Sequence, residues 1–182
     1  MDYSKLSIGN NPPHEVNVIV EVPLRADPIK YELDKESGAI FVDRYLYTTM
    51  FYPCNYGFIP HTLADDGDPI DIMVIGRLPV QPGVVLRANP IGVLLMEDEA
   101  GIDAKILAKP TDKITQINRK VLSYKDVPEI DLQRIEHFFS HYKDLEPEKW
   151  VKVQGWGDAD EAKRLIVEGI EAEKIEAKKK AS

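Results

Sequence analysis

The stretch VVLRANPIGVLLM, residues 84–96, is the longest strand-like run in the chain and indicates a fold built mainly of β-strands. It is rich in Val, Leu and Ile, which pack well on a pleated surface. Pro90 interrupts it, and a proline inside a strand is typical of an edge or a bulge because it has no backbone N–H. The run therefore predicts one long strand with an irregularity near its middle.

Shorter runs on both sides of residues 84–96 have the same character. VNVIVEV at 16–22 alternates apolar and polar residues, which predicts a half-buried strand. Further strands are predicted at 29–33, 39–42, 70–75, 102–108 and 150–153, the last of them ended by GWG at 155–157. Many short strands separated by Gly and Pro favour a small barrel or a sandwich.

The last third of the chain changes to helical spacing. Apolar residues recur every three or four positions over 131–145, which predicts a helix there. Asp158 stands three residues before Glu161, a pattern that starts helices, and Leu165, Ile166 and Ile170 would form the buried stripe of this second helix. Residues 175–182, mostly Ala, Lys and Glu, are expected to fray. Because no linker divides the chain, we expect one domain over residues 1–182.

Composition limits the classes of function. The 23 basic and 31 acidic residues give a formal net charge of −8, which argues against general affinity for nucleic acid or anionic membrane. Cys54 is the only cysteine, so an intrachain disulfide is excluded and a reducing compartment is favoured. The sequence has neither an apolar run of membrane-spanning length nor the layout of a signal peptide. We therefore expect a cytoplasmic protein.

The most informative segment is DDGDPID, residues 65–71. It places four carboxylates within seven positions, and like charges this close repel one another. A hard divalent cation with oxygen ligands would relieve that repulsion. A solvated acidic turn before a strand is the alternative. An EF-hand is excluded, because counting from Asp66 puts Asp71 where the loop needs Gly and Arg77 where it needs Glu.

A second acidic segment, EDEAGIDAK at residues 97–105, lies about thirty positions later. It also reads as a charged hairpin loop, but Asp103 stands at a strand start with Lys105 on the same face. Lys30 and Glu32 likewise share a strand face, Arg44 lies at a strand end, and residues 52–57 are dense in Tyr. Carboxylates for Mg²⁺ beside Lys, Arg and Tyr for phosphate oxygens are the combination that phosphoryl transfer to water requires.

Other motifs do not point to a different chemistry. The chain has no Gly-rich dinucleotide loop and no phosphate-binding loop ending in Gly-Lys-Ser/Thr. His137 and His141 lie four positions apart, which could make a metal pair, although an exposed or subunit-contact face of the helix is the favoured interpretation. As a contact face, the pair could make assembly sensitive to pH.

Several blocks of the sequence together resemble the family I soluble inorganic pyrophosphatases. DGDPIDI at 66–72 is similar to the signature of that family. The resemblance extends over residues 14–170, and its short length is similar to the bacterial branch. The other blocks that carry it are DPIKYE at 27–32, FVDR at 41–44, FYPCNYG at 51–57, DEAGIDAK at 98–105, HFFSHYKDL at 137–145 and WVKV at 150–153.

The resemblance implies a mainly β (α+β) fold, a five-stranded barrel of the OB type with two or more flanking helices. It implies hydrolysis of inorganic pyrophosphate to two phosphates, with three or four Mg²⁺ per active site that Mn²⁺ or Zn²⁺ can replace. It also implies a homohexamer. The expected mechanism is in-line attack by water activated between metal ions, with no covalent intermediate.

The resemblance also implies roles for individual residues. Asp66, Asp71 and Asp103 match the ligands of the first metal, and Asp71 is shared with a second. Asp98, Asp103 and Glu32 match further metal ligands, and Asp68 matches the group that takes the proton from the attacking water. The phosphate-binding set is Lys30, Arg44, Tyr56, Tyr142 and Lys143, joined by Lys105; Glu21 and Tyr52 match active-site positions whose roles are less defined.

Two other functions remain compatible with the residues alone. A metal-dependent hydrolase of other short phosphoanhydrides would use the same Lys, Arg and Tyr side chains. A non-catalytic OB-type module that binds an anion or an oligonucleotide is the other alternative. It would need a basic groove with stacking aromatic rings, whereas this chain concentrates carboxylates near its Tyr residues.

Overall fold

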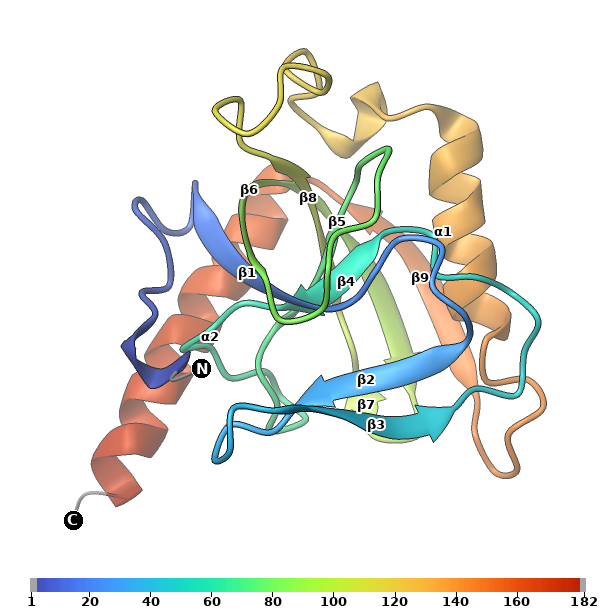
Figure 1. Ribbon diagram of the computed structural model, residues 1–182, viewed down its shortest axis with the longest axis horizontal. Helices are drawn as coiled ribbons and strands as arrows, with labels where there is room; N and C mark the ends of the chain where they lie inside the picture. The colour runs from blue at the N-terminus through green and yellow to red at the C-terminus, as the bar shows by residue number, and fades with distance from the viewer. Residues whose placement is uncertain (1–2, 181–182) are drawn as a thin grey trace.

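The computed structural model, which describes residues 3–180, contains a closed ring of strands with two helices packed outside it (Figure 1). No helix within the described residues is long and apolar enough to cross a membrane. The elements in chain order are η1 (Tyr3–Lys5), β1 (Val16–Val22), β2 (Ile29–Leu33), β3 (Ile40–Tyr45), β4 (Asn55–Phe58), β5 (Asp71–Val74), β6 (Val85–Asp98), β7 (Gly101–Ile102), β8 (Lys105–Pro110), η2 (Tyr124–Asp126), α1 (Glu129–His141), β9 (Val151–Gly157) and α2 (Ala159–Lys180).

The ring consists of β1, β4, β5, β8 and β6, and β6 pairs with β1 to close it. All neighbours in it are antiparallel except β5 and β8, which run parallel with Ile72 beside Ile106. This arrangement confirms the five-stranded barrel and the two flanking helices.

The predicted half-buried strand at 16–22 is wrong in one respect. Both faces of β1 are buried, Asn17 and Glu21 included, because the barrel core covers one face while the N-terminal segment and the β2–β3 ribbon cover the other.

The long strand β6 organises the rest of the sheet. It pairs with β1 and β8 along its first part and with β7 and β9 toward its end. Its register shifts between Pro90 and Gly92, which confirms the predicted bulge. β9 continues through Gly155–Gly157, which sequence patterns assigned to a strand break; Gly157 pairs with Val93, and a Cβ there would lie 2.7 Å from the Val93 Cγ1. Gly157 therefore permits the pairing of β9 with β6 and does not end the strand early.

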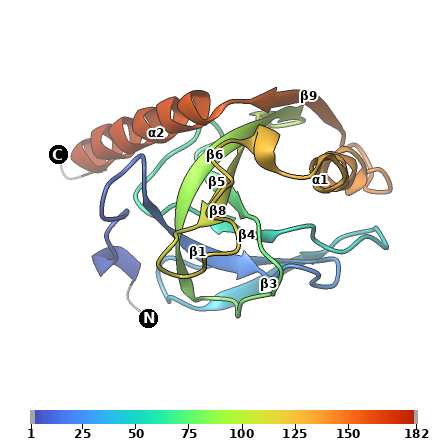
Figure 2. The same ribbon diagram turned by 90° about the horizontal axis from the view of Figure 1, so that it is seen from above.

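The two helices cover different sides of the barrel, as the view from above shows (Figure 2). α2 buries Ala162 and Ile166 in one apolar cluster of the barrel. Its start is confirmed, because the Asp158 Oδ1 accepts the backbone N–H of Glu161 at 2.9 Å. Residues 175–180, where the sequence predicts fraying, continue the helix, and residues 181 and 182 lie outside the described part. Ala, Lys and Glu favour helix, and pairs such as Lys174–Glu171 span its turns.

Helix α1 ends four residues earlier than predicted. Its buried side chains are Ile135, Phe138 and Phe139, which pack in the apolar cluster on the other side of the barrel. Tyr142 caps the helix, and its backbone N–H donates to the Phe138 carbonyl. The apolar spacing that suggested residues up to 145 continues past this cap, although the Leu145 side chain is mostly exposed. The early end leaves Tyr142 and Lys143 on a segment that leads toward β9.

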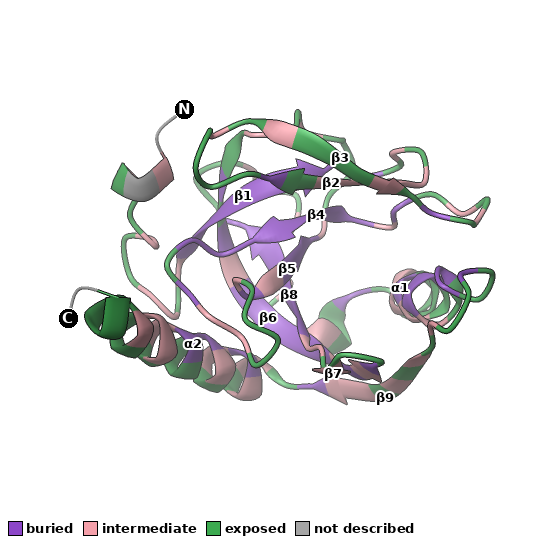
Figure 3. Cartoon of the chain, turned by 90° about the horizontal axis from the view of Figure 1, so that it is seen from below, coloured by how far each residue is buried: buried purple, intermediate pink, exposed green. Residues whose placement is uncertain are grey.

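Strands β2 and β3 form a separate two-stranded ribbon below the barrel in Figure 1. The ribbon is more exposed than the ring strands, as the colouring by burial shows (Figure 3). Lys30 pairs with Arg44 across it, so these two cations lie beside each other. The ribbon thus supplies one wall of the site described next.

Candidate active site

One cavity of about 240 Å³ contains every side chain that the sequence predicted to be functional. It lies among the β2–β3 ribbon, the starts of β5 and β8, and the segment that follows α1. The predicted residues that line it are Glu21, Lys30, Glu32, Arg44, Tyr52, Tyr56, Asp66, Asp68, Asp71, Asp98, Asp103, Lys105, Tyr142 and Lys143.

Carboxylates line one side of the cavity, and the parallel pairing of β5 and β8 brings two of them together. Asp71 begins β5, and Asp103 lies two residues before Lys105, which begins β8. The Lys105 Nζ lies 2.5 Å from the Asp71 Oδ2 and 2.5 Å from the Asp103 Oδ1. A single ammonium therefore joins the two carboxylates.

The turn before β5 adds two more carboxylates. The Asp68 N–H donates to the Asp66 Oδ1 at 3.0 Å, and Gly67 between them has φ of 89°, a conformation that favours glycine. Desolvation, together with Asp103 and Asp71, raises the pKa of Asp66. Burial also raises the pKa of Asp103, although Lys105 opposes that rise. Both shifts disfavour the charged form of these carboxylates, chiefly because burial removes water from them.

Cations and further acids complete the lining of the cavity. The Lys143 Nζ donates to the Asp98 Oδ2 at 2.6 Å and lies 3.3 Å from a Glu99 carboxylate oxygen. Burial raises the pKa of Asp98, but its bond to Lys143 more than offsets this and the pKa lies below its usual range. Lys30 contacts Glu32, as their shared strand face predicted. The Arg44 Nη1 donates to the Asp43 Oδ2 at 2.8 Å.

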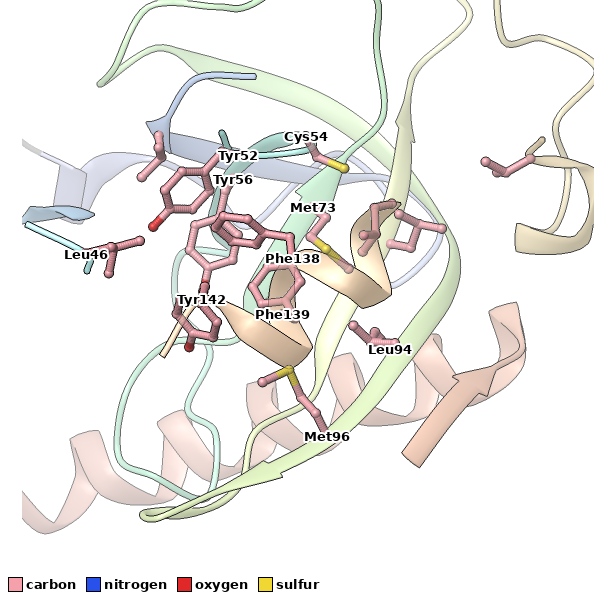
Figure 4. Packing of buried hydrophobic residues seen from close by; sticks show 14 of the residues in the cluster. Leu46, Tyr52, Cys54, Tyr56, Met73, Leu94, Met96, Phe138, Phe139 and Tyr142 are labelled. Atoms are coloured by element: carbon pink, nitrogen blue, oxygen red, sulfur yellow. The ribbon is translucent and has the colours of Figure 1, made fainter. Parts of the chain in front are cut away.

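Three tyrosines connect the cavity to the apolar cluster beneath it. The rings of Tyr52, Tyr56 and Tyr142 lie next to Phe138 and Phe139 of α1 (Figure 4). Burial raises the pKa of all three phenols. The hydroxyl groups therefore stay protonated near neutral pH and can donate hydrogen bonds to an anion in the cavity.

The donor set fits a hard divalent cation. Carboxylate oxygens are what Mg²⁺ prefers, and those of Asp66, Asp71 and Asp103 line one cavity. Within residues 3–180, no three His, Cys, Asp or Glu side chains already stand close enough together to hold a metal. The Lys105 ammonium instead lies between the carboxylates of Asp71 and Asp103.

The histidine pair of α1 lies outside this cavity. The rings of His137 and His141 are 4.7 Å apart between centroids, and the His141 Nδ1 lies 2.8 Å from the Asp144 Oδ2. His137 lines a second, larger cavity of about 740 Å³. Of the predicted functional residues only Tyr52 reaches that cavity, so the predicted chemistry belongs to the smaller one.

Several side chains of the site were not singled out from the sequence. Asp43 and Glu99 lie inside the blocks that carry the family resemblance, and their neighbours Arg44 and Asp98 could have directed attention to them. Glu146 has no such signal, because it follows an exposed Leu in a charged segment. The others are Lys35 and Lys149, which line the cavity.

Comparisons with known proteins agree with this geometry. The family model described as inorganic pyrophosphatase matches residues 18–174. An inorganic pyrophosphatase of Rhodospirillum rubrum is 61% identical over 173 residues, covering 95% of this chain and 97% of its own. One of Agrobacterium fabrum is 60% identical and covers 97% and 99%. Among solved structures, an inorganic pyrophosphatase of Thermus thermophilus has a TM-score of 0.89 and 43% identity, covering 96% of this chain and 99% of its own.

Proposed function

The chain belongs to the bacterial family I inorganic pyrophosphatases, and we propose how its side chains divide the work of that reaction. The enzyme is a hydrolase that cleaves pyrophosphate into two phosphates. The observation that carries the proposed mechanism is the cavity itself, which is lined by carboxylates at the start of β5 and just before β8 and by cations and phenols, some of them from the β2–β3 ribbon and the segment after α1.

Asp66, Asp71 and Asp103 would hold Mg²⁺, and Asp98 and Glu32 would contribute further oxygens. When bound, Mg²⁺ supplies positive charge that acidifies a coordinated water and offsets the charge of the substrate. The chain's own contribution is to gather the acids. The pairing of β5 with β8 brings Asp71, at the start of β5, to Asp103, just before β8, and the Gly67 turn adds Asp66 to the same cavity. Mn²⁺ or Zn²⁺ could replace Mg²⁺ at such oxygen ligands.

Asp68 accepts the proton of the attacking water in this proposal. Its backbone N–H is tied to Asp66 and its carbonyl accepts the Ala64 N–H at 2.7 Å, so the backbone of the turn is held on both sides of the residue. The carboxylate lines the cavity while remaining accessible to solvent. A positioned carboxylate that removes a proton contributes about 10²–10⁴-fold to a rate.

Lys30, Arg44, Tyr56, Tyr142 and Lys143 would bind the phosphate oxygens, with Lys105 supporting the acids on the other side. The protonated phenols carry O–H donors, and the ammonium and guanidinium groups carry charged N–H donors. They can therefore stabilise the negative charge that develops on the leaving phosphate. Water attacks phosphorus directly, so the catalytic effect comes from placement and electrostatics and requires no covalent intermediate.

We extend the proposal to the oligomeric state, the domain organisation and the cellular compartment of the protein. Exposed apolar side chains such as Phe41, Tyr45 and Phe51 support assembly of several copies, which we propose to be a homohexamer. The match of one family model to residues 18–174 supports a single domain. The one cysteine, buried and free, supports the cytoplasm. Light scattering coupled to gel filtration measures the number of copies; a monomer would contradict the hexamer.

The test of the proposed function is phosphate release from pyrophosphate, tripolyphosphate and ATP, with and without Mg²⁺. We expect pyrophosphate to be the preferred substrate and release to require the metal. The variant Asp68→Asn should lose most activity, whereas Asp65→Asn, an exposed neighbour outside the cavity, should keep it. Equal losses in the two variants would remove the proposed role of Asp68. Equal rates with tripolyphosphate or ATP would indicate a broader phosphoanhydride hydrolase.

A further inference from the structure

Glu146 is a buried acid beside the active site for which the proposed chemistry has no use. It lies between α1 and β9 and is 9% exposed. Its Oε2 is 3.3 Å from the Arg44 Nε and 3.2 Å from the Lys149 Nζ, while its Oε1 is buried and accepts no hydrogen bond in the described structure. Burying a carboxylate costs several kcal/mol unless its partners repay the lost hydration. We therefore looked for a role that Glu146 could have in the active site.

The partner that Glu146 meets is a guanidinium with a defined set of donors. Arg44 has five N–H groups in a rigid plane, and two of its nitrogens have acidic neighbours. The Nη1 donates to Asp43, and the Nε faces Glu146. The Nε makes no hydrogen bond to any described residue, so Glu146 acts on the guanidinium through the charge of a close ion pair. The two ion pairs restrict a long side chain that would otherwise sample several rotamers, and they leave the Nη2 donors for a phosphate in the cavity.

The contact also joins two walls of the cavity that are far apart in sequence. Arg44 belongs to the β2–β3 ribbon, which is not part of the barrel sheet. Glu146 belongs to the segment that carries Tyr142 and Lys143, and in Figure 1 this segment descends from α1 toward the end of β3. Glu146 does not line the cavity itself. Any effect on the substrate must therefore pass through the side chains that it holds.

We propose that Glu146 is a positioning residue that orients Arg44 toward the phosphate groups of the substrate. The inference rests on the proposed function of the cavity. The pKa of Arg44 supports it: burial lowers this pKa, but Glu146 and Asp43 together raise it above its usual range. Lys149 is a second cation held by the same carboxylate, and it also lines the cavity.

The variant Glu146→Gln keeps the shape of the side chain and removes its charge. We expect kcat/KM for pyrophosphate to fall on the order of tenfold, mainly through KM, because a misoriented donor weakens binding of the phosphate. Glu146→Asp keeps the charge on a shorter side chain and should lose less than Glu146→Gln. The control is Glu148→Gln, the same chemical change at an exposed position of the same segment, which should leave both constants unchanged.

A double-mutant cycle separates positioning from a merely structural role. If Glu146 acts through Arg44, then Glu146→Gln in an Arg44→Ala background causes little further loss in kcat/KM. The same tenfold loss in both backgrounds would overturn the proposal, as would unchanged KM and kcat in Glu146→Gln. Thermal unfolding of each variant shows whether it is folded, and Glu146→Asp carries the test if Glu146→Gln does not fold.

A second readout keeps this proposal separate from the proposed function. If the parent protein released no phosphate from pyrophosphate, the proposed function would fail. The affinity for inorganic phosphate, measured by calorimetry in the parent, Glu146→Gln and Glu148→Gln, would then test Glu146 alone. Weaker binding only in Glu146→Gln supports the positioning role, and equal affinity in all three proteins contradicts it.

Discussion

Replacing Lys105 with Met tests the charge balance of the acidic side of the cavity. Lys105→Met keeps a long, unbranched side chain and removes the ammonium between Asp71 and Asp103. Lys105 is 3% exposed, and the Asp71 and Asp103 side chains are 26% and 14% exposed. Two carboxylates would then lie close together with no cation between them. Because both are partly shielded from water, their repulsion should destabilise the folded protein.

The expected loss follows from the burial of the three groups. Removing one partner of a buried ion pair costs roughly 3–5 kcal/mol, and the partial exposure of Asp71 points to the lower end, about 3 kcal/mol. In a chain of this length each kcal/mol shifts the melting temperature by about 2–4 °C, so we expect a decrease of about 6–12 °C without metal. The loss should be smaller near pH 5 than near pH 8, because the Asp103 carboxylate, whose pKa is raised by burial and would lose the opposing effect of Lys105, takes up a proton more readily at low pH.

Thermal unfolding with and without Mg²⁺ measures both effects. Mg²⁺ should raise the melting temperature of Lys105→Met more than that of the parent, because the metal replaces the missing positive charge. Lys109→Met is the matched control: Lys109 lies on the same strand, is 5% exposed, and pairs with Asp112 away from the cavity. It should be destabilised without extra rescue by Mg²⁺. An unchanged melting temperature in Lys105→Met, or equal rescue of both variants, would refute the reasoning.

Three further substitutions test other parts of the account. Asp71→Asn should weaken Mg²⁺ binding in calorimetry and nearly abolish phosphate release; near-normal hydrolysis at modest Mg²⁺ would remove its proposed role as a metal ligand. Asp68→Asn should lower turnover by about 10²–10⁴-fold while Mg²⁺ still binds, and a pH–rate profile identical to the parent's would argue against Asp68 as the proton acceptor. Burial raises the pKa of Glu21 to about 8 from 4.5, so the folded state of the parent holds this proton more tightly and loses stability as pH rises through that range. The metal-free variant Glu21→Gln has no carboxyl group at this position and should not lose stability in this way. From pH 5 to pH 8 the unfolding free energy of the parent should therefore fall by roughly 3–5 kcal/mol relative to that of the variant, as measured by denaturant titrations. The same pH dependence in both proteins would contradict the burial argument.

Local patterns predicted the strands well where composition is distinctive. The run at 16–22 corresponds to β1 because branched residues fill it, and the run at 29–33 corresponds to β2 because apolar and charged residues alternate there. β4 was not predicted, since it has only four residues, Asn55–Phe58, and two of them, Asn and Gly, are depleted in strands. Gly57 allows β4 to lie close to β1, because a Cβ there would be 1.9 Å from the Ile19 carbonyl oxygen. Such a contact between distant segments leaves no periodic signal.

The ends of elements were less predictable, for a related reason. The helix predicted over 131–145 ends at His141, because Tyr142 and Lys143 turn into the cavity instead of continuing the turn. β9 runs to Gly157 because β6 pairs with it there. In both places tertiary contacts decide the boundary, and local propensity does not report them.

The candidate site was predictable as a set of residue types but not as a place. Acidic clusters at 65–71 and 97–105 indicated metal binding, while the resemblance to a family supplied the roles. The parallel pairing of β5 with β8 is what brings Asp71 to Asp103, and no local pattern in either strand predicts that pairing. Glu146 shows the limit most clearly, since only the folded chain reveals that it meets Arg44.

The most direct test of the central claim is a crystal structure grown with Mn²⁺, whose anomalous scattering locates each metal ion independently of the refined side chains. The account predicts Mn²⁺ within coordinating distance of carboxylate oxygens of Asp66, Asp71 and Asp103, with the Lys105 ammonium moved from between Asp71 and Asp103. Anomalous peaks elsewhere, with Lys105 still paired to both carboxylates under conditions that support hydrolysis, would contradict it.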